Sequence, residues 1–320
     1  MGDVLVASSL FTLLRQKFPD AELHFMIDKK HQDILKNNPE IDQLVFFEDS
    51  FSSNLKLIKS QKYDAIVDVY SKIGTALLSK LSGVKKTSGY RKSYLSFLYT
   101  NPISRKKEPI SKETALAIEH RQQVLEPLGI QYAKVFPKIY LSEEEKSNAK
   151  LLLQKFGADF SKPISMISTF GSTPDKTYPF MKEVLEDIAQ FSNVQILCNY
   201  LPSQKEDFKV LFDSINSETK SKIVLDFDTK NLREFIAVTS FCTVLIGNEG
   251  GATNVSKALG VPTFGIFAPY VDKKTWAWAE DGIKNTSIHV HDYIASSESY
   301  ADLKTELFKE KLHQWLSENM

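Results

Sequence analysis

The sequence lacks the features of several protein classes. It has two cysteines in 320 residues, and its 40 Lys and Arg balance its 40 Asp and Glu. Cys198 and Cys242 lie in separate apolar runs without metal-ligand spacing, which argues against a disulfide scaffold or a cysteine metal site. No apolar run approaches the roughly 20 residues that cross a bilayer, and no signal-peptide pattern is present. We therefore expect a soluble, cytoplasmic protein without the net positive charge of a general nucleic-acid binder.

The zero net charge hides a local excess of positive charge. From Lys72 to Arg121 there are 11 Lys and Arg and 3 Asp and Glu, and aromatic residues lie between the basic ones. Such a surface suits an anionic partner or an anionic membrane face, although a merely solvated face is the alternative. The part of this stretch from Lys85 to Ser111 is expected to be a loop.

Apolar strands alternate with helical segments along the chain, which predicts an α/β fold. Three strands are expected in 22–27, 43–47 and 65–70, and a second series is expected in 164–169, 194–199, 223–225 and 243–246. Two such series predict two doubly wound, Rossmann-like domains, residues 1–157 and 163–300, followed by a C-terminal helix in 301–320 that packs back toward the first domain. Ligands are expected in a cleft facing the carboxyl ends of the strands.

The second domain contains a glycine-rich turn between a strand and a helix. Residues 243–246 form the strand, Gly250 and Gly251 open the turn, and the helix ends at Gly260. Without a β-carbon the backbone N–H groups of the turn can approach a bound group, and the start of a helix favours an anion such as phosphate. The alternative is a tight turn whose glycines only relieve backbone strain.

A second polar turn, residues 169–179, follows the first strand of the same domain. Since parallel strands end at one edge of their sheet, both turns are expected on the same rim. Lys176 could neutralise a diphosphate, and Ser172 and Thr173 could donate hydroxyl groups. A solvated lysine in a polar loop is the alternative.

With these turns placed, the chain resembles glycosyltransferase family 9, the bacterial heptosyltransferases of lipopolysaccharide synthesis, which have the GT-B fold. Met1–Leu5 resembles the family's Gly-Asp turn before a helix, and residues 175–179 resemble its Lys-x-Trp-Pro signature, with Tyr178 in place of Trp. Residues 247–254 resemble Asp-Thr-Gly-x-x-His, with Glu249 for Asp, Gly250 for Thr and Asn254 for His. The stretches 258–262 and 266–269 match the segments that follow.

The resemblance implies an inverting, metal-independent transfer of a heptose or related sugar from a nucleoside-diphosphate sugar, with no cofactor. Asp3 would be the catalytic base, unless it serves only as a helix cap. The donor would be bound by Lys176, Ser172, Thr173, Glu249, Gly250, Gly251, Ala252 and Thr253. An anionic or lipid-linked saccharide acceptor, of lipopolysaccharide type, would be bound by Lys85, Lys86, Arg91, Lys92 and Arg121, with peripheral contact to the inner membrane.

Two further expectations follow. Family members have a strand before the Gly-Asp turn, so the first sheet is expected to lack its first strand here and to leave neighbouring strand edges unpaired. Two rival functions share the expected architecture: a nucleotide-sugar epimerase of GT-B fold, and a non-enzymatic two-lobed protein that binds a small ligand. Neither rival requires both Asp3 and an acceptor site.

Overall fold

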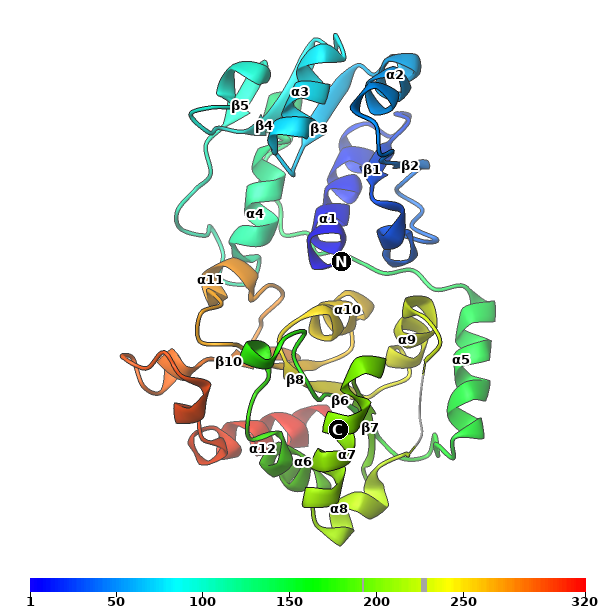
Figure 1. The fold of residues 1–320 in the computed structure, drawn as a ribbon, viewed down its shortest axis with the longest axis vertical. Helices are drawn as coiled ribbons and strands as arrows, with labels where there is room; N and C mark the ends of the chain where they lie inside the picture. The colour runs from blue at the N-terminus through cyan, green and yellow to red at the C-terminus, as the bar shows by residue number, and fades with distance from the viewer. Residues whose placement is uncertain (192, 226–228) are drawn as a thin grey trace. The chain divides into compact units, whose positions relative to one another are not determined.

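The computed structural model describes residues 1–191, 193–225 and 229–320, and it divides into two compact units (Figure 1). Unit 1 comprises Met1, Asp3–Lys138 and Lys274–Trp278, and unit 2 comprises Gly2, Ile139–Lys273 and Ala279–Met320. The expected two-domain α/β architecture is confirmed. None of the helices in the described ranges has both the length and the hydropathy of a membrane-spanning segment.

Unit 1 begins with a buried helix and contains two small parallel sheets. Its elements are α1 (Gly2–Lys17), β1 (His24–Ile27), η1 (Lys29–Ile34), β2 (Gln43–Phe46), α2 (Phe51–Gln61), β3 (Ala65–Asp68), α3 (Ile73–Leu81), β4 (Lys86–Tyr90), η2 (Ser96–Leu98), β5 (Asn101–Ile103), α4 (Ala115–Gln123) and η3 (Glu126–Leu128). β1 pairs with β2, and β3, β4 and β5 form the other sheet. Among the described residues no ladder joins β1 to β3.

The segment expected as a loop, 85–111, contains β4 and β5. β4 has the sequence Lys-Thr-Ser-Gly-Tyr, which has no aliphatic residue, so its apolar pattern does not indicate a strand. Its neighbours determine its conformation: β4 pairs with β3 on one side and β5 on the other. Gly89 lies against the ring of Tyr99, and a β-carbon there would lie 2.4 Å from Tyr99 Cζ. This close approach requires glycine.

Unit 2 contains one five-stranded parallel sheet in the order β10-β9-β8-β6-β7. Its elements are α5 (Glu143–Lys155), β6 (Ile164–Ser168), η4 (Pro174–Lys176), α6 (Met181–Ala189), β7 (Gln195–Asn199), η5 (Pro202–Gln204), α7 (Lys205–Ser214), α8 (Ser217–Lys222), α9 (Leu232–Thr239), β8 (Val244–Asn248), α10 (Gly251–Leu259), β9 (Thr263–Ile266), β10 (Asn285–Ile288), η6 (Val290–Asp292), η7 (Tyr300–Asp302), η8 (Thr305–Leu307) and α12 (Lys309–Asn319). Between β9 and β10 the chain forms α11 (Lys273–Trp276), most of which belongs to unit 1. Every residue of β6 and β8 is buried, as expected for parallel strands covered on both faces.

The units divide earlier than the expected boundary at 157–163. The division falls between Lys138 and Ile139, so α5 belongs to unit 2. α5 packs on α9, and Arg233 Nε lies 2.7 Å from Glu145 Oε1 in a nearly buried ion pair. Hydrophobic periodicity marks α5 as a helix but does not identify the domain that it joins.

The C-terminal helix is also placed differently from the expectation that it packs toward the first domain. Residues 300–307 form two short 3₁₀ turns, and α12 follows them. Leu312, Trp315 and Leu316 belong to the core of unit 2, where the Trp315 ring lies 5.6 Å from that of Phe264 on β9. An amphipathic helix has an apolar face in any fold, and only packing decides what covers that face.

Candidate active site

Two polar turns of unit 2 lie side by side, as the strand pattern predicts. β6 and β8 are adjacent parallel strands with Ser168 opposite Gly247, so both chains leave the sheet at the same edge (Figure 1). The Lys176 turn follows β6, and the glycine-rich turn with α10 follows β8. This is the sheet edge at which α/β folds bind ligands.

Asn248, the last residue of β8, joins the two turns. Its side-chain Nδ2 donates to the carbonyl oxygens of Ser168 at 2.9 Å and Thr169 at 3.0 Å. Its Oδ1 accepts the backbone N–H of Tyr178 at 2.6 Å. The residue is 1% exposed, so water cannot replace these bonds. The sequence does not predict this role, because an asparagine at a strand end does not reveal its partners.

The turn that carries Lys176 is anchored at both ends. Gly171 lies so close to the Lys176 backbone that a β-carbon there would be 2.5 Å from the Lys176 carbonyl carbon. Tyr178 is buried, and its hydroxyl donates to the Leu303 carbonyl oxygen at 2.6 Å. Its ring meets Phe180, Tyr300 and Phe308 edge to face. The tyrosine therefore holds this turn against the core.

The polar groups of this turn differ in what they contact. Lys176 is partly exposed, and no carboxylate lies within 4.0 Å of its ammonium among the described residues. Ser172 and Thr173 are exposed. A hydrogen bond from the Thr173 hydroxyl, together with one from Tyr270 at 2.5 Å, lowers the pKa of Asp175. Thr173 thus contacts Asp175, whereas Lys176 forms no ion pair within the described residues.

The start of α10 offers two backbone donors. Gly250 N–H donates to Thr253 Oγ1 at 3.0 Å, and the Thr253 hydroxyl donates back to the Gly250 carbonyl at 2.9 Å. Thr253 is buried, so its hydroxyl serves this local cap. The N–H groups of Gly251 and Ala252, in the first turn of α10, have no acceptor among the described residues. They are the helix-start donors that suit an anion.

Glu249 is largely buried between these turns. Burial raises the pKa of its carboxyl above the usual range, and the positive charges of Lys176 and Lys257 and a hydrogen bond from Asn254 act in the opposite direction. Lys257 is itself buried, 3.6 Å from Glu280 Oε1. Asn254, in the place of the family's histidine, also donates to the Gly250 carbonyl at 2.7 Å. The partly buried carboxylate of Glu249 is a candidate to orient hydroxyl groups of a donor sugar.

In unit 1 the carboxylate of Asp3 is exposed and paired with Arg121. Asp3 lies in the first turn of α1, whose N-cap is Met1, so Asp3 is not the helix cap. Its Oδ1 lies 2.5 Å from Arg121 Nη2, and its side chain is 76% exposed. Arg121 Nη1 also donates to the Ala117 carbonyl at 2.5 Å. Arg121, expected to bind acceptor, therefore contacts the expected base.

The structure separates the other four predicted acceptor residues into two groups. Lys85 and Lys86 lie at the amino end of β4, and Arg91 and Lys92 follow its carboxyl end. A strand advances about 3.3 Å per residue, so the two pairs lie at opposite ends of β4, one beside the amino ends and one beside the carboxyl ends of the strands. Only Arg91 and Lys92 lie at the carboxyl-end edge, where ligands are expected. The two pairs are close in the sequence, and because β4 was expected to be a loop, the sequence did not predict that a strand separates them.

Lys92 is held in place by residues to which the sequence analysis assigned no role. Asp68, buried at the end of β3, accepts a hydrogen bond from the Tyr99 hydroxyl at 2.7 Å and from the Ser71 N–H at 2.8 Å. Lys92 Nζ donates to the Ser71 carbonyl at 2.6 Å. Burial and the nearby charges of Arg105 and Lys72 lower the pKa of Lys92. Several cations therefore crowd the carboxyl ends of β3 and β4.

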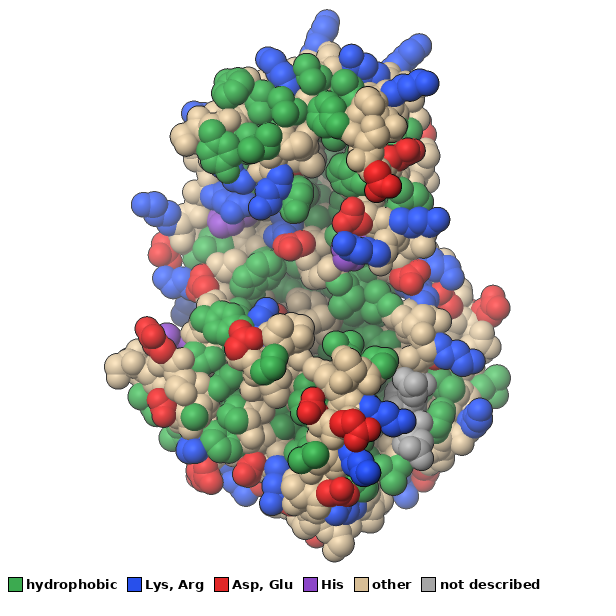
Figure 2. Space-filling model, viewed as in Figure 1, with side chains coloured by type: hydrophobic (Ala, Val, Ile, Leu, Met, Phe, Trp, Pro, Cys, Tyr) green, Lys and Arg blue, Asp and Glu red, His purple; other side chains and the backbone are tan. Residues whose placement is uncertain are grey.

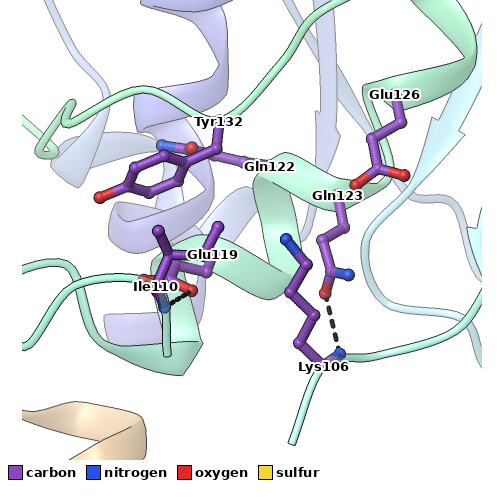
Figure 3. A pocket seen from close by; sticks show the side chains of 7 residues that line it. All are labelled: Lys106, Ile110, Glu119, Gln122, Gln123, Glu126 and Tyr132. Atoms are coloured by element: carbon purple, nitrogen blue, oxygen red, sulfur yellow. Dashed lines mark hydrogen bonds between the residues drawn. The ribbon is translucent and has the colours of Figure 1, made fainter. Parts of the chain in front are cut away.

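Unit 1 also contains a small pocket beside α4, which Figure 3 shows. Its polar groups largely bind each other: the Glu119 carboxylate accepts the Ile110 N–H, and Gln123 Oε1 accepts the Lys106 N–H at 3.2 Å. The pocket contains none of the predicted site residues. We do not assign it a ligand.

Comparison with known proteins identifies the family. The model of glycosyltransferase family 9 (heptosyltransferase) matches residues 53–300, which is most of the chain. The chain belongs to glycosyltransferase family 9. Membership confirms the resemblance of the motifs and shows that the protein is a glycosyltransferase, which decides against the two rival functions.

Relatives within glycosyltransferase family 9 match over most of their length. Lipopolysaccharide heptosyltransferase 1 of Campylobacter coli is 22% identical, over 83% of this chain and 81% of its own length. A family 9 glycosyltransferase structure from Veillonella parvula superposes with a TM-score of 0.82 at 18% identity, covering 99% of this chain and 95% of that one. The Escherichia coli ADP-heptose lipopolysaccharide heptosyltransferase II gives 0.75 at 17% identity, with 99% and 96% covered. The fold is therefore GT-B.

The Asn248 hydrogen bonds generate a testable prediction. Asn248→Ala removes three buried hydrogen bonds, two to carbonyl oxygens and one from a backbone N–H, and each buried polar group left unsatisfied costs about 1–3 kcal/mol. We expect a loss of several kcal/mol in the free energy of unfolding, measured by denaturant titration. Asn199→Ala is the matched control, since Asn199 ends β7 and its side chain makes no hydrogen bond among the described residues. Equal stability of the two variants would contradict the role of Asn248.

The burial of Glu249 generates a prediction about pH. Because the pKa of the folded state is raised, the fold favours protonated Glu249, and stability is lost as the pH rises through that pKa. Glu249→Gln should therefore be more stable than the wild type at pH 7, and the difference should shrink as the pH is lowered to about 4. Denaturation curves across this range test it, with exposed Glu206→Gln as the control. A Glu249→Gln variant less stable than wild type at pH 7 would refute it.

Proposed function

We propose that this protein is an inverting, metal-independent glycosyltransferase that moves a heptose or related sugar from a nucleoside-diphosphate sugar to a lipopolysaccharide-type acceptor. The observation that carries the proposal is the joined pair of turns in unit 2, which presents Lys176 and the donors of α10 at one sheet edge. Family membership and the names of the relatives, which include an ADP-heptose enzyme, support the heptose and the acceptor class.

The departing diphosphate needs its charge stabilised. The Lys176 ammonium and the N–H groups of Gly251 and Ala252 supply positive charge and hydrogen-bond donors without a metal ion. Donors fixed in advance are worth a few kcal/mol each in a transition state. The Asn248 bonds supply this fixation, because they hold the ends of both turns. Thr253 supports the turn through Gly250, and Glu249 orients hydroxyl groups of the donor.

Asp3 is the proposed general base. The acceptor hydroxyl oxygen attacks the anomeric carbon, the bond from that carbon to the diphosphate oxygen breaks, and the hydroxyl proton passes to the Asp3 carboxylate. The ion pair with Arg121 orients the carboxylate and leaves it exposed to an acceptor. Attack from the face opposite the leaving group inverts the anomeric centre. This step requires Asp3 and the donor sugar to come within hydrogen-bond reach of one acceptor hydroxyl.

The acceptor is proposed to be an anionic, lipid-linked saccharide. Arg91 and Lys92 follow β4 at the same sheet edge where Arg121 holds Asp3, and Arg105 contributes positive charge beside Tyr90, 3.8 Å from its ring centroid. Lys85 and Lys86, at the opposite edge, are not assigned to this site. The lipid-linked acceptor of such a reaction places the enzyme at the cytoplasmic face of the inner membrane, with the donor supplied from the cytoplasm.

The leaving-group site can be tested by ligand-induced stabilisation. The melting temperature is measured with ADP, GDP, UDP and CDP, and we expect one nucleotide to raise it. Lys176→Ala should abolish most of this rise, because the ammonium is the proposed counter-charge of the diphosphate. Lys209→Ala, an exposed lysine on α7, serves as the control and should keep it. A rise unaffected by Lys176→Ala would contradict the site.

The base can be tested by sugar transfer. Asp3→Asn keeps the shape of the side chain but cannot accept the proton, so kcat should fall about 10²- to 10⁴-fold while the nucleotide still raises the melting temperature. Transfer from ADP-heptose to a lipopolysaccharide acceptor lacking heptose is measured. Asp64→Asn, an exposed carboxylate of the same unit, is the control. Asp3→Asn with nearly wild-type kcat would exclude Asp3 as the base.

A further inference from the structure

One stretch of unit 1 contains only positive charge. Between Val69 and Lys107 there is no Asp or Glu, and there are nine basic residues: Lys72, Lys80, Lys85, Lys86, Arg91, Lys92, Arg105, Lys106 and Lys107. In the part of the chain that the structure describes, none of the nine lies within 4.0 Å of a carboxylate oxygen. Most surface cations have nearby acidic residues, so a stretch this long without any suits an external anion.

Large apolar side chains are exposed within the same stretch. Tyr70, Ile73, Leu81, Tyr94 and Phe97 are 63%, 58%, 48%, 58% and 71% exposed, and we call these five residues the α3 face. They belong to α3 and to the segments that flank it. Scattered exposed apolar residues are normal in soluble proteins, but a group with aromatic members marks an interaction surface.

Packing under the α3 face explains why these side chains point outward. The segment from Lys92 to Thr100 lies along α3, and Leu95, Leu98 and Tyr99 pack on Ala76 in a buried cluster. Tyr94 and Phe97 occupy the alternate positions and remain in solvent. The fold therefore buries one side of this segment and exposes its aromatic side.

Basic residues flank the α3 face. Lys72 Nζ lies 5.6 Å from the centre of the Tyr70 ring, and Lys92, two residues before Tyr94, is held on the Ser71 carbonyl. Lys80 adjoins Leu81 at the other end of α3. Figure 2 shows hydrophobic side chains gathered over α3 and the segment between β4 and β5, with basic side chains beside them.

We propose that the α3 face docks this protein onto an anionic lipid bilayer, an interaction beyond the proposed sugar transfer. Aromatic rings with adjacent cations suit the interface, where rings enter the acyl boundary and basic side chains meet lipid phosphates. Each Lys or Arg near an anionic surface adds about tenfold or less to the affinity. An acidic protein partner is the competing occupant, but five exposed apolar residues with unpaired cations beside them match a lipid surface more closely.

The test is flotation of the purified protein with vesicles, without donor or acceptor. Vesicles of phosphatidylcholine are compared with vesicles that also contain 30% phosphatidylglycerol, an amount chosen for a strong surface charge. Binding is expected to the anionic vesicles only, and it should weaken when the salt concentration is raised, because salt screens the lysines and arginines.

Matched variants separate the contribution of the apolar side chains to vesicle binding from that of the basic side chains. Tyr94→Ser with Phe97→Ser should weaken vesicle binding at least about tenfold, because two apolar anchors are lost. Val210→Ser on α7 of unit 2, at the same 71% exposure as Phe97, should not. Lys72→Gln with Lys80→Gln should weaken binding by about tenfold, whereas Lys205→Gln with Lys209→Gln should not.

Three results would overturn the proposal. They are no binding to anionic vesicles, equal binding to neutral vesicles, and binding that survives the Tyr94 and Phe97 changes. The first result would point to a protein partner. Because the vesicles contain no substrate, failure here leaves the nucleotide and Asp3 tests intact. If docking holds, Tyr94→Ser with Phe97→Ser should impair transfer to a vesicle-bound acceptor and leave transfer to a detergent-solubilised acceptor unchanged.

Discussion

The candidate donor site depends on the hydrogen bonds of one buried amide, that of Asn248. An amide side chain has both a donor and an acceptor end, so it can take the Tyr178 N–H and serve two carbonyls after β6 at the same time. Without it, the carboxyl ends of β6 and β8 would still be neighbours, but the turns that leave them would have no fixed relation. The position of Lys176 relative to α10 follows from this single residue and from the buried ring of Tyr178.

The turns that Asn248 connects carry groups that could bind a ligand. Glu249 is partly buried, and the charges of Lys176 and Lys257 and a hydrogen bond from Asn254 compensate its burial only in part. The N–H groups at the start of α10 have no protein acceptor in the described part of the chain, and the Lys176 ammonium has no ion-pair partner there. Free N–H groups at a helix start and an ammonium without an ion-pair partner favour a bound anion, and burial of a carboxylate costs stability unless hydrogen bonds or charges compensate it. Their occurrence together at one sheet edge is the physical reason to regard it as a substrate site.

The basic residues of unit 1 form groups that differ in what they contact. Arg121 holds Asp3, Arg91 and Lys92 follow the carboxyl end of β4, and Lys72 and Lys80 border the exposed apolar residues of the α3 face. The buried Asp68–Tyr99 hydrogen bond lies beneath this arrangement and, through Ser71, fixes Lys92. A charged saccharide and a charged bilayer surface would thus be met by neighbouring parts of the same unit.

The sequence by itself determined the alternation of strands and helices, the two polar turns and their shared sheet edge. These are local properties: apolar strands, Gly250 and Gly251 before a helix, and Lys176 after a strand each show their structure within a few residues. Only the tertiary structure decided which partners those residues meet. It paired Arg121 with Asp3 across 118 positions, separated Lys85 from Arg91 by a strand without aliphatic residues, and placed α5 and α12 in unit 2. Periodicity defines the face that a segment buries, whereas the partner of that face depends on packing between residues far apart in the chain, and no local pattern records it.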